Sequence, residues 1–167
     1  MFFYNNADNT NIVKIIGAKL GDYAKGLTLR RKTMAFFEWT DKLSVGVEQM
    51  DLQHKKLISI INDFHNTTSI GDDKSAVQKA INGLVDYVQM HFAEEETLMQ
   101  KYNFPQFGIH RRLHERLAQD VSEYAVKLQG GQKIMGIEMA FFLKGWLENH
   151  IGETDKKYGL YIIQQKK

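Results

Sequence analysis

Histidines and carboxylates interrupt the apolar faces of several segments that otherwise have the periodicity of amphipathic helices. Such side chains bind first-row metal ions, and each would cost free energy if it faced a protein core without a partner. Five histidines and two carboxylates are placed in this way: His54, His91, Glu95, His110, His114, His150 and Asp155. The chemistry that would satisfy all seven together is the binding of metal ions.

The spacing of these residues brings several of them onto common helical faces. Residues at i and i+4 are neighbours on a helix surface, and two pairs have this spacing, His91 with Glu95 and His110 with His114. His150 and Asp155 are five residues apart, which on an ideal α-helix leaves them about 140° from a common direction. For Asp155 to join His150, the last helix must bend, bulge or unwind, and Gly152 makes that cheaper.

Taken singly, each signal also has a structural explanation. A lone histidine such as His54, or an HxxxH pair, is commonly a hydrogen-bonded core group, and Asp155 alone would suit a solvated helix end. Seven such groups on the inward faces of helices in one chain have no comparable structural explanation. His65 is an internal control, because it follows His54 by eleven residues and would lie about 16 Å further along the axis. We expect His65 to be a core or helix-end histidine outside the site.

The elements that must position these residues are four amphipathic helices. The apolar spacing predicts them over about residues 50–66, 73–102, 107–128 and 135–158, with Asp72 or Asp73 as an N-cap, Pro105 and Gly130-Gly131 as breaks, and an end near Gly159. Short connections make successive helices antiparallel. We therefore predict an all-α fold, an antiparallel up-down-up-down four-helix bundle with an N-terminal extension. In that topology the seven polar residues converge at one end of the core.

Several apolar residues are expected inside this bundle, and some of them near the metal site. Those expected on the inner stripes are Leu57, Ile58, Ile61, Phe64, Leu84, Val88, Leu98, Tyr102, Phe107, Leu117, Val121, Tyr124, Leu128, Met135, Met139, Phe142, Leu143 and Trp146. Those that could supply a dry lining for the site are Phe92, Leu98, Phe142 and Trp146. A lining of this kind would keep protons and reductants away from a bound ligand.

Composition excludes several other kinds of protein. Cysteine is absent from the 167 residues, which excludes disulfides, thiolate metal sites, iron–sulfur clusters and cysteine nucleophiles. A net charge of +2 gives no strong field that would indicate a nucleic-acid or membrane partner. No stretch approaches the roughly 18 apolar residues of a membrane span, and no signal peptide is evident. We expect a soluble, cytoplasmic protein.

The N-terminal residues differ from the rest of the chain. Residues 1–33 carry six basic and two acidic side chains, a net of +4, so residues 34–167 carry −2. We therefore divide the chain into an extension, 1–33, and the bundle, 34–167. Helical spacing of apolar residues in the extension, weakened by three glycines, leaves open a loosely ordered leader or a short helix that binds a protein partner.

The ligand set narrows the choice of metal. Seven ligands are too many for one tetrahedral zinc ion, and calcium and magnesium prefer oxygen ligands. A histidine-rich set with two carboxylates suits a pair of first-row metals bridged by the carboxylates, with iron as the first candidate. Ferritin-like di-iron bundles rely on Glu-x-x-His pairs, which the inner faces of this chain lack.

The same motifs resemble those of the hemerythrin-domain family of the bacterial type. The matching stretches are WTDKLSVGVEQMDLQHKKL, HFAEEETLM, HRRLH and WLENHIGETD, spread over about residues 38–158. The resemblance implies two non-heme iron ions joined by an oxo or hydroxo bridge. It implies that His110, His114 and His150 saturate one iron, that His54 and His91 hold the other, and that Glu95 and Asp155 bridge them. Trp146 and Leu147 match positions that line the oxygen pocket of the family, although both also suit plain core packing.

The resemblance implies reversible binding of O2, for storage or delivery, by a protein that is not an enzyme. Three alternatives stay open: an O2 or redox sensing module, a di-iron enzyme acting on peroxide or nitric oxide, and an iron-handling protein. O2 is the expected partner, with no nucleic acid or membrane, and a protein could bind through residues 1–33. The oligomeric state does not follow from the sequence.

Overall fold

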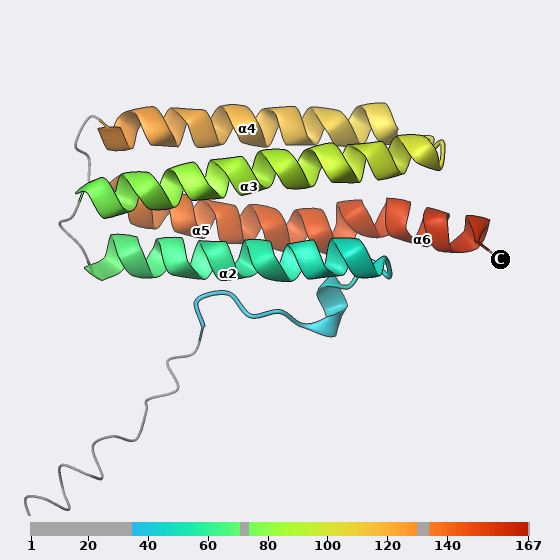
Figure 1. Ribbon diagram of the computed structural model, residues 1–167, viewed down its shortest axis with the longest axis horizontal. Coiled ribbons are helices and arrows are strands. Elements are labelled where there is room, and N and C mark those ends of the chain that lie inside the picture. Colours follow the sequence, from blue (N-terminus) through green and yellow to red (C-terminus); the bar gives the residue numbers. More distant parts are fainter. Residues whose placement is uncertain (1–34, 71–73, 130–133, 167) are drawn as a thin grey trace, which may run out of the picture. The chain divides into compact units, whose positions relative to one another are not determined.

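The computed structural model describes residues 35–70, 74–129 and 134–166, and these residues form helices and no strands (Figure 1). The elements are the short 3-10 helix η1 (Asp41–Leu43), α2 (Glu48–Ile70), α3 (Lys74–Lys101), α4 (Phe107–Gln129), α5 (Ile134–Asn149), the π-helical turn η2 (His150–Asp155) and α6 (Lys156–Gln165). The expected extension, residues 1–33, and the expected cap and break at Asp72, Asp73 and Gly130-Gly131 lie outside the described residues.

The predicted four-helix bundle is confirmed. Helix α2 packs against α3 and α5, and α4 packs against the same two helices. Successive helices run in opposite directions, with α5, η2 and α6 following one another as the fourth rod (Figure 1). None of the helices in the described part of the chain is long and apolar enough to cross a membrane.

The core lies along the facing stripes of these helices. Nine of the residues that the spacing places on the inner stripes are buried: Leu57, Ile58, Ile61, Phe64, Leu84, Leu117, Val121, Met139 and Leu143. Others on the same stripes are only partly buried: Val88, Leu98, Tyr102, Phe107, Tyr124, Phe142 and Trp146. The buried residues form one continuous cluster with aromatic residues from the segment before α2, such as Phe37. The bundle is therefore held together by burial of apolar area along its whole length.

The first helix is longer than the apolar spacing predicts. It begins at Glu48 and continues through Thr67 and Thr68 to Ile70, where the sequence suggests a loop. The hydroxyl of Thr67 donates to the carbonyl of Asp63 at 2.8 Å, and that of Thr68 to the carbonyl of Phe64 at 3.0 Å. Because these hydroxyls bond back to the preceding turn, the polar residues do not interrupt the helix.

The expected end near Gly159 is wrong, since α6 runs through this glycine to Gln165. A Cβ atom at Gly159 would lie 2.1 Å from the carbonyl oxygen of Val45. The glycine therefore permits close approach of two backbones rather than ending a helix. It marks the place where the segment before α2 packs against the last helix.

That segment is fastened to α2 by two side chains. The carboxylate of Asp51 accepts hydrogen bonds from the Ser44 hydroxyl at 2.6 Å and the Val45 amide at 2.8 Å. The Asn62 side chain accepts from the amide of Phe37 and donates to its carbonyl, both at 2.8 Å. These bonds hold residues 37–45 against the side of the bundle.

Candidate metal centre

The structure brings together all seven side chains that the sequence singles out. His54 comes from α2, His91 and Glu95 from α3, His110 and His114 from α4, and His150 and Asp155 from η2. Each is at most 5% exposed. The segments that carry them lie toward the end of the bundle where α3 turns into α4, as the antiparallel topology requires (Figure 1).

Three of the histidines face one another closely. The Nε2 atom of His114 lies 3.1 Å from Nε2 of His110 and 3.1 Å from Nε2 of His150. Oε2 of Glu95 is 3.0 Å from Nε2 of His114 and 3.3 Å from Nε2 of His110. Ligand atoms of these four residues all lie within 4.8 Å of one another, so they form one group that could hold a metal ion.

A second group shares a carboxylate with the first. It consists of His54, His91 and Glu95, whose ligand atoms also lie within 4.8 Å of one another. The rings of His54 and His91 meet edge to face, with centroids 4.9 Å apart. Glu95 therefore stands between a three-histidine group and a two-histidine group.

Asp155 connects the same two groups through separate oxygens. Its Oδ1 lies 3.0 Å from Nε2 of His150 and 3.3 Å from Nε2 of His110. Its Oδ2 lies 3.4 Å from Nε2 of His54. Two buried carboxylates thus lie between two sets of imidazoles.

The π-helical turn makes the position of Asp155 possible. In η2 the backbone has i→i+5 hydrogen bonding over HIGETD, between α-helical residues on both sides. A wider turn returns residue i+5 to the face of residue i, which an α-helix does not do. The distortion that the five-residue spacing demands is therefore a π-bulge, of the kind often found at functional sites.

The donor atoms fit metal ions better than they fit one another. Both carboxylate oxygens of Glu95 and of Asp155, and both ring nitrogens of His54, are buried and make no well-aligned hydrogen bond, although imidazole nitrogens lie 3.0–3.4 Å from the carboxylates. Such orphaned groups are costly in a protein interior. Two nitrogens bound at about 2.1 Å with a right angle between them would stand about 3.0 Å apart, close to the 3.1 Å separations of His114 from its two neighbours. This cluster of histidines and carboxylates can bind a non-heme metal, and its composition points to iron.

The outward nitrogens of two imidazoles have polar partners. Nδ1 of His114 donates to Oε1 of Glu96 at 3.0 Å, and Nδ1 of His91 donates to Oε1 of Gln53 at 2.8 Å. With the proton on Nδ1, the lone pair of Nε2 points into the cluster. Both rings are therefore held in the tautomer that a metal ion needs.

Burial and the carboxylates set the protonation of the cluster. Burial lowers the pKa of His91 to about 4, against 6.5 for an ordinary histidine. Burial opposes the charged form of Glu95, but His110 and His114 outweigh it and hold the pKa of Glu95 well below 4.5. Burial likewise opposes protonation of His114, yet the Glu95 and Glu96 carboxylates raise the pKa of His114 above 6.5.

Aromatic side chains close the site from two directions. Phe92 stacks on the His114 ring at a centroid distance of 3.7 Å, and Trp146 stacks on His150 at 4.1 Å. Leu147, the other expected pocket residue, is buried. The expectation that Phe142 lines the site is wrong: it packs on Tyr124 at 5.4 Å, about 12 Å along the helix from His150.

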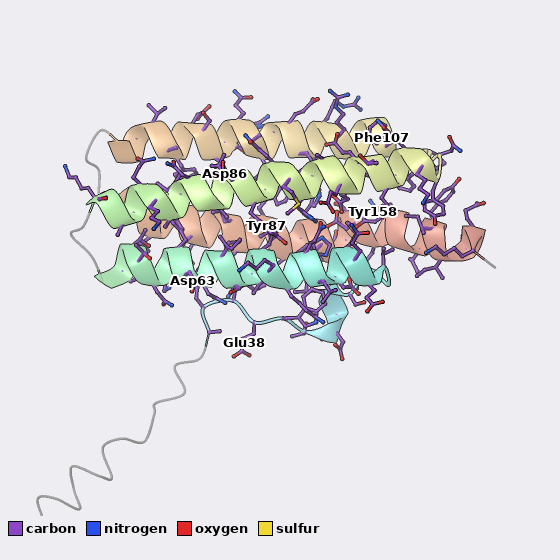
Figure 2. All side chains as sticks on the ribbon, in the orientation of Figure 1. Glu38, Asp63, Asp86, Tyr87, Phe107 and Tyr158 are labelled. Carbon is purple, nitrogen blue, oxygen red and sulfur yellow. The ribbon has the colours of Figure 1, made fainter. Side chains whose placement is uncertain are left out.

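Tyr158 is a neighbour of the cluster that the sequence did not reveal. Its side chain lies on α6 and is fully buried (Figure 2), its hydroxyl makes no well-aligned hydrogen bond, and its ring centroid lies 5.7 Å from that of His110. Burial, with Glu95 and Asp155 nearby, raises the pKa of Tyr158 well above 10. The phenol therefore stays protonated and uncharged beside the carboxylates. The only sequence signal was its position three residues after Asp155.

A four-helix bundle with buried histidines and carboxylates at one end defines a metal-binding helical protein, and the comparisons identify its family. The family model of the Hemerythrin HHE cation binding domain matches residues 45–161. The chain therefore belongs to the hemerythrin family.

Individual relatives agree with this assignment. The chain is 38% identical over 125 residues to the bacteriohemerythrin of Pseudomonas aeruginosa, covering 75% of this chain and 80% of the relative. It is 35% identical over 127 residues to that of Methylococcus capsulatus, covering 75% and 96%. The crystal structure of wild-type hemerythrin superposes with a TM-score of 0.70 at 33% identity, covering 75% of this chain and 96% of that one.

Proposed function

We propose that this protein binds two non-heme iron ions and uses them to bind O2 reversibly, for storage or delivery. The observation that carries the proposal is the position of Glu95 and Asp155 between a three-histidine and a two-histidine group. Two carboxylates that each reach both groups suit a pair of metal ions better than a single one. The kinship with bacteriohemerythrins supports the same function.

In this proposal the two metal positions are unequal. His110, His114 and His150 would hold one iron, His54 and His91 the other, and Glu95 and Asp155 would bridge them with an oxo or hydroxo group. The position with fewer histidines keeps room for a small ligand. When bound, the iron pair would supply the two electrons that bind O2 and take them back on release.

The protein's own residues would control charge and water. The two buried carboxylates offset half the charge of two ferrous ions, which lets the pair reside in an apolar bundle. Phe92 and Trp146 cover imidazole faces, and we propose that Trp146 and Leu147 line the ligand pocket. A dry lining keeps protons from the bound oxygen and favours release over further reaction.

The test is a cycle of oxygenation on one sample. The protein is loaded with ferrous iron without air, exposed to O2 and then flushed with inert gas, while its visible absorption is followed. We expect colour to appear with O2 and to vanish on flushing over repeated cycles. Irreversible conversion to the ferric form in the first cycle would refute the carrier function and favour a sensor or an oxidising enzyme. Ready loss of iron to a mild chelator would instead favour iron handling.

A further inference from the structure

Three consecutive glutamates on α3, Glu94, Glu95 and Glu96, point in three directions. Successive residues of an α-helix diverge by about 100°, so only the middle one can face the core. Glu95 is fully buried in the cluster, whereas Glu96 is 24% exposed and Glu94 lies on the surface. Each outer glutamate nonetheless connects to a histidine of the cluster.

Glu96 reaches its histidine directly. Its Oε1 accepts from Nδ1 of His114 at 3.0 Å, on the side of the ring opposite the cluster. Its Oε2 lies 4.0 Å from Nε of Arg111, which is closer to Glu115 at 3.0 Å. The strongest contact of Glu96 is therefore with the imidazole and not with the surface cation.

Glu94 reaches its histidine through an amide. Its Oε2 accepts from the side-chain nitrogens of Gln49, at 2.9 Å, and of Gln53, at 2.5 Å. Because the Gln53 nitrogen must donate to this carboxylate, its oxygen is the atom that faces Nδ1 of His91 at 2.8 Å. An amide oxygen can only accept, so it fixes the proton of His91 on Nδ1.

We infer that Glu94 and Glu96 are positioning residues for the two metal positions, each orienting one histidine, and that they do so unequally. The inference rests on the ligand set of the proposed function. The anion of Glu96 touches its imidazole and makes it a stronger donor, whereas a neutral amide separates Glu94 from His91. The three-histidine position should therefore bind metal more tightly and favour its oxidised state more than the two-histidine position.

A purely structural role explains these contacts poorly. Exposed ion pairs contribute little to stability, and the 4.0 Å distance between Glu96 and Arg111 is at the limit of such a pair. Neither glutamate fills space in the core. Both glutamates are connected to the outward ring nitrogen of a histidine, Glu96 directly and Glu94 through Gln53. The hydrogen-bond partner at that nitrogen sets the orientation and basicity of a metal-binding imidazole.

The test compares three isosteric variants: Glu96→Gln, Glu94→Gln and, as the matched control, Glu115→Gln, which removes the other partner of Arg111. Metal-free protein is titrated with ferrous iron without air against a competing chelator. Glu96→Gln should weaken the affinity of one of the two irons by about 10–100-fold. Glu94→Gln should have a smaller effect, and Glu115→Gln none. Circular dichroism confirms that each variant is folded.

Two further readouts separate positioning from stability. The reduction potential of the iron-loaded Glu96→Gln variant should be more positive than that of the wild type. Glu96→Asp, which keeps the charge, should recover part of the lost affinity. Wild-type affinity and potential in folded Glu96→Gln, or an equal loss in Glu115→Gln, would overturn the inference. Because these measurements use iron alone, a failure of reversible oxygenation would refute the proposed function and leave this result standing.

Discussion

Nε2 of His150 lies 3.0 Å from Oδ1 of Asp155, although five residues separate them in the chain. The contact exists because the last helix changes to π-helical hydrogen bonding over these residues and then returns to an α-helix. The widened turn directs both side chains into the cluster, and the helix stays continuous from α5 through η2 to α6. Its backbone bonds are kept, so the distortion needs no break in the helix.

Glu95→Ala should lower the iron content well below two per chain. The substitution removes the carboxylate shared by both groups and leaves His110 and His114 without the oxygen that lies 3.3 and 3.0 Å away. Iron per chain is measured by elemental analysis after reconstitution. The exposed Glu123→Ala on α4 serves as the control and should retain the full content. Two irons in Glu95→Ala would contradict the bridging role.

His65→Ala should leave the iron content unchanged. The His65 ring stacks on Phe36 at 3.9 Å and meets Phe141 edge-on, away from the cluster. Loss of the stack should lower the free energy of unfolding by about 0.5–1.5 kcal/mol, measured by chemical denaturation. His54→Ala, in the same helix, should by contrast lose iron. Equal iron loss in the two variants would show that the cluster is not organised as described.

Gly159→Ala should destabilise the fold, whereas Gly83→Ala should not. A Cβ at Gly159 meets the Val45 carbonyl oxygen at 2.1 Å, and backbone cannot move aside like a side chain. We expect a loss of about 1–3 kcal/mol or more, as for other overpacked sites. Gly83 lies within helix α3, and a Cβ atom there would have no neighbour within 4 Å. Alanine at this position should therefore raise the free energy of unfolding by about 0.5–1 kcal/mol. Urea denaturation of both variants checks the contrast, and similar midpoints would refute it.

The metal-free protein should be most stable near pH 6.5. Because the pKa of His91 is lowered to about 4, the unfolded chain binds a proton between pH 6.5 and 4 that the folded one does not, so stability falls as pH decreases. The lowered pKa of Glu95 continues the loss below pH 4.5. The raised pKa of His114 has the opposite effect on stability. The stabilisation that it gives is present below pH 6.5 and is lost as the pH rises above that value.

Denaturation of the metal-free protein at pH 5, 6.5 and 8 measures this profile. A His91→Asn variant, which has no titrating group at that position, should lose much of the acid-side decline. A flat profile in the wild type between pH 5 and 6.5 would show that the His91 imidazole is not desolvated as the structure indicates.

The bundle and the meeting of the seven side chains could be predicted from spacing and topology. His91 with Glu95, and His110 with His114, lie one helical turn apart, and antiparallel order brings the remaining three residues to the same level. The spacing of His150 and Asp155 even required a local distortion. It did not specify a π-turn, because bending, bulging and unwinding all satisfy the same angular mismatch.

Other features depend on what lies across space and leave no periodic signal. Gly159 looks like a helix end unless one knows that Val45 passes beside it. Gln53 and Glu96 occupy positions where any polar surface residue would fit, so their bonds to histidines could not be read from spacing. Phe142 lies on the inward stripe, but it is eight residues from His150, about 12 Å along the helix axis, and too far away to line the site.

The segment that precedes α2 also fixes how small a working fragment of this protein can be. Leu43 lies 3.9 Å from where a Cβ of Gly152 would be, inside the π-turn, and Val45 backs onto Gly159 one turn beyond it. A fragment cut at Glu48 would retain every proposed ligand and still lack this support behind η2. Expression boundaries for the domain therefore belong upstream of Phe37, whose backbone is bonded to Asn62.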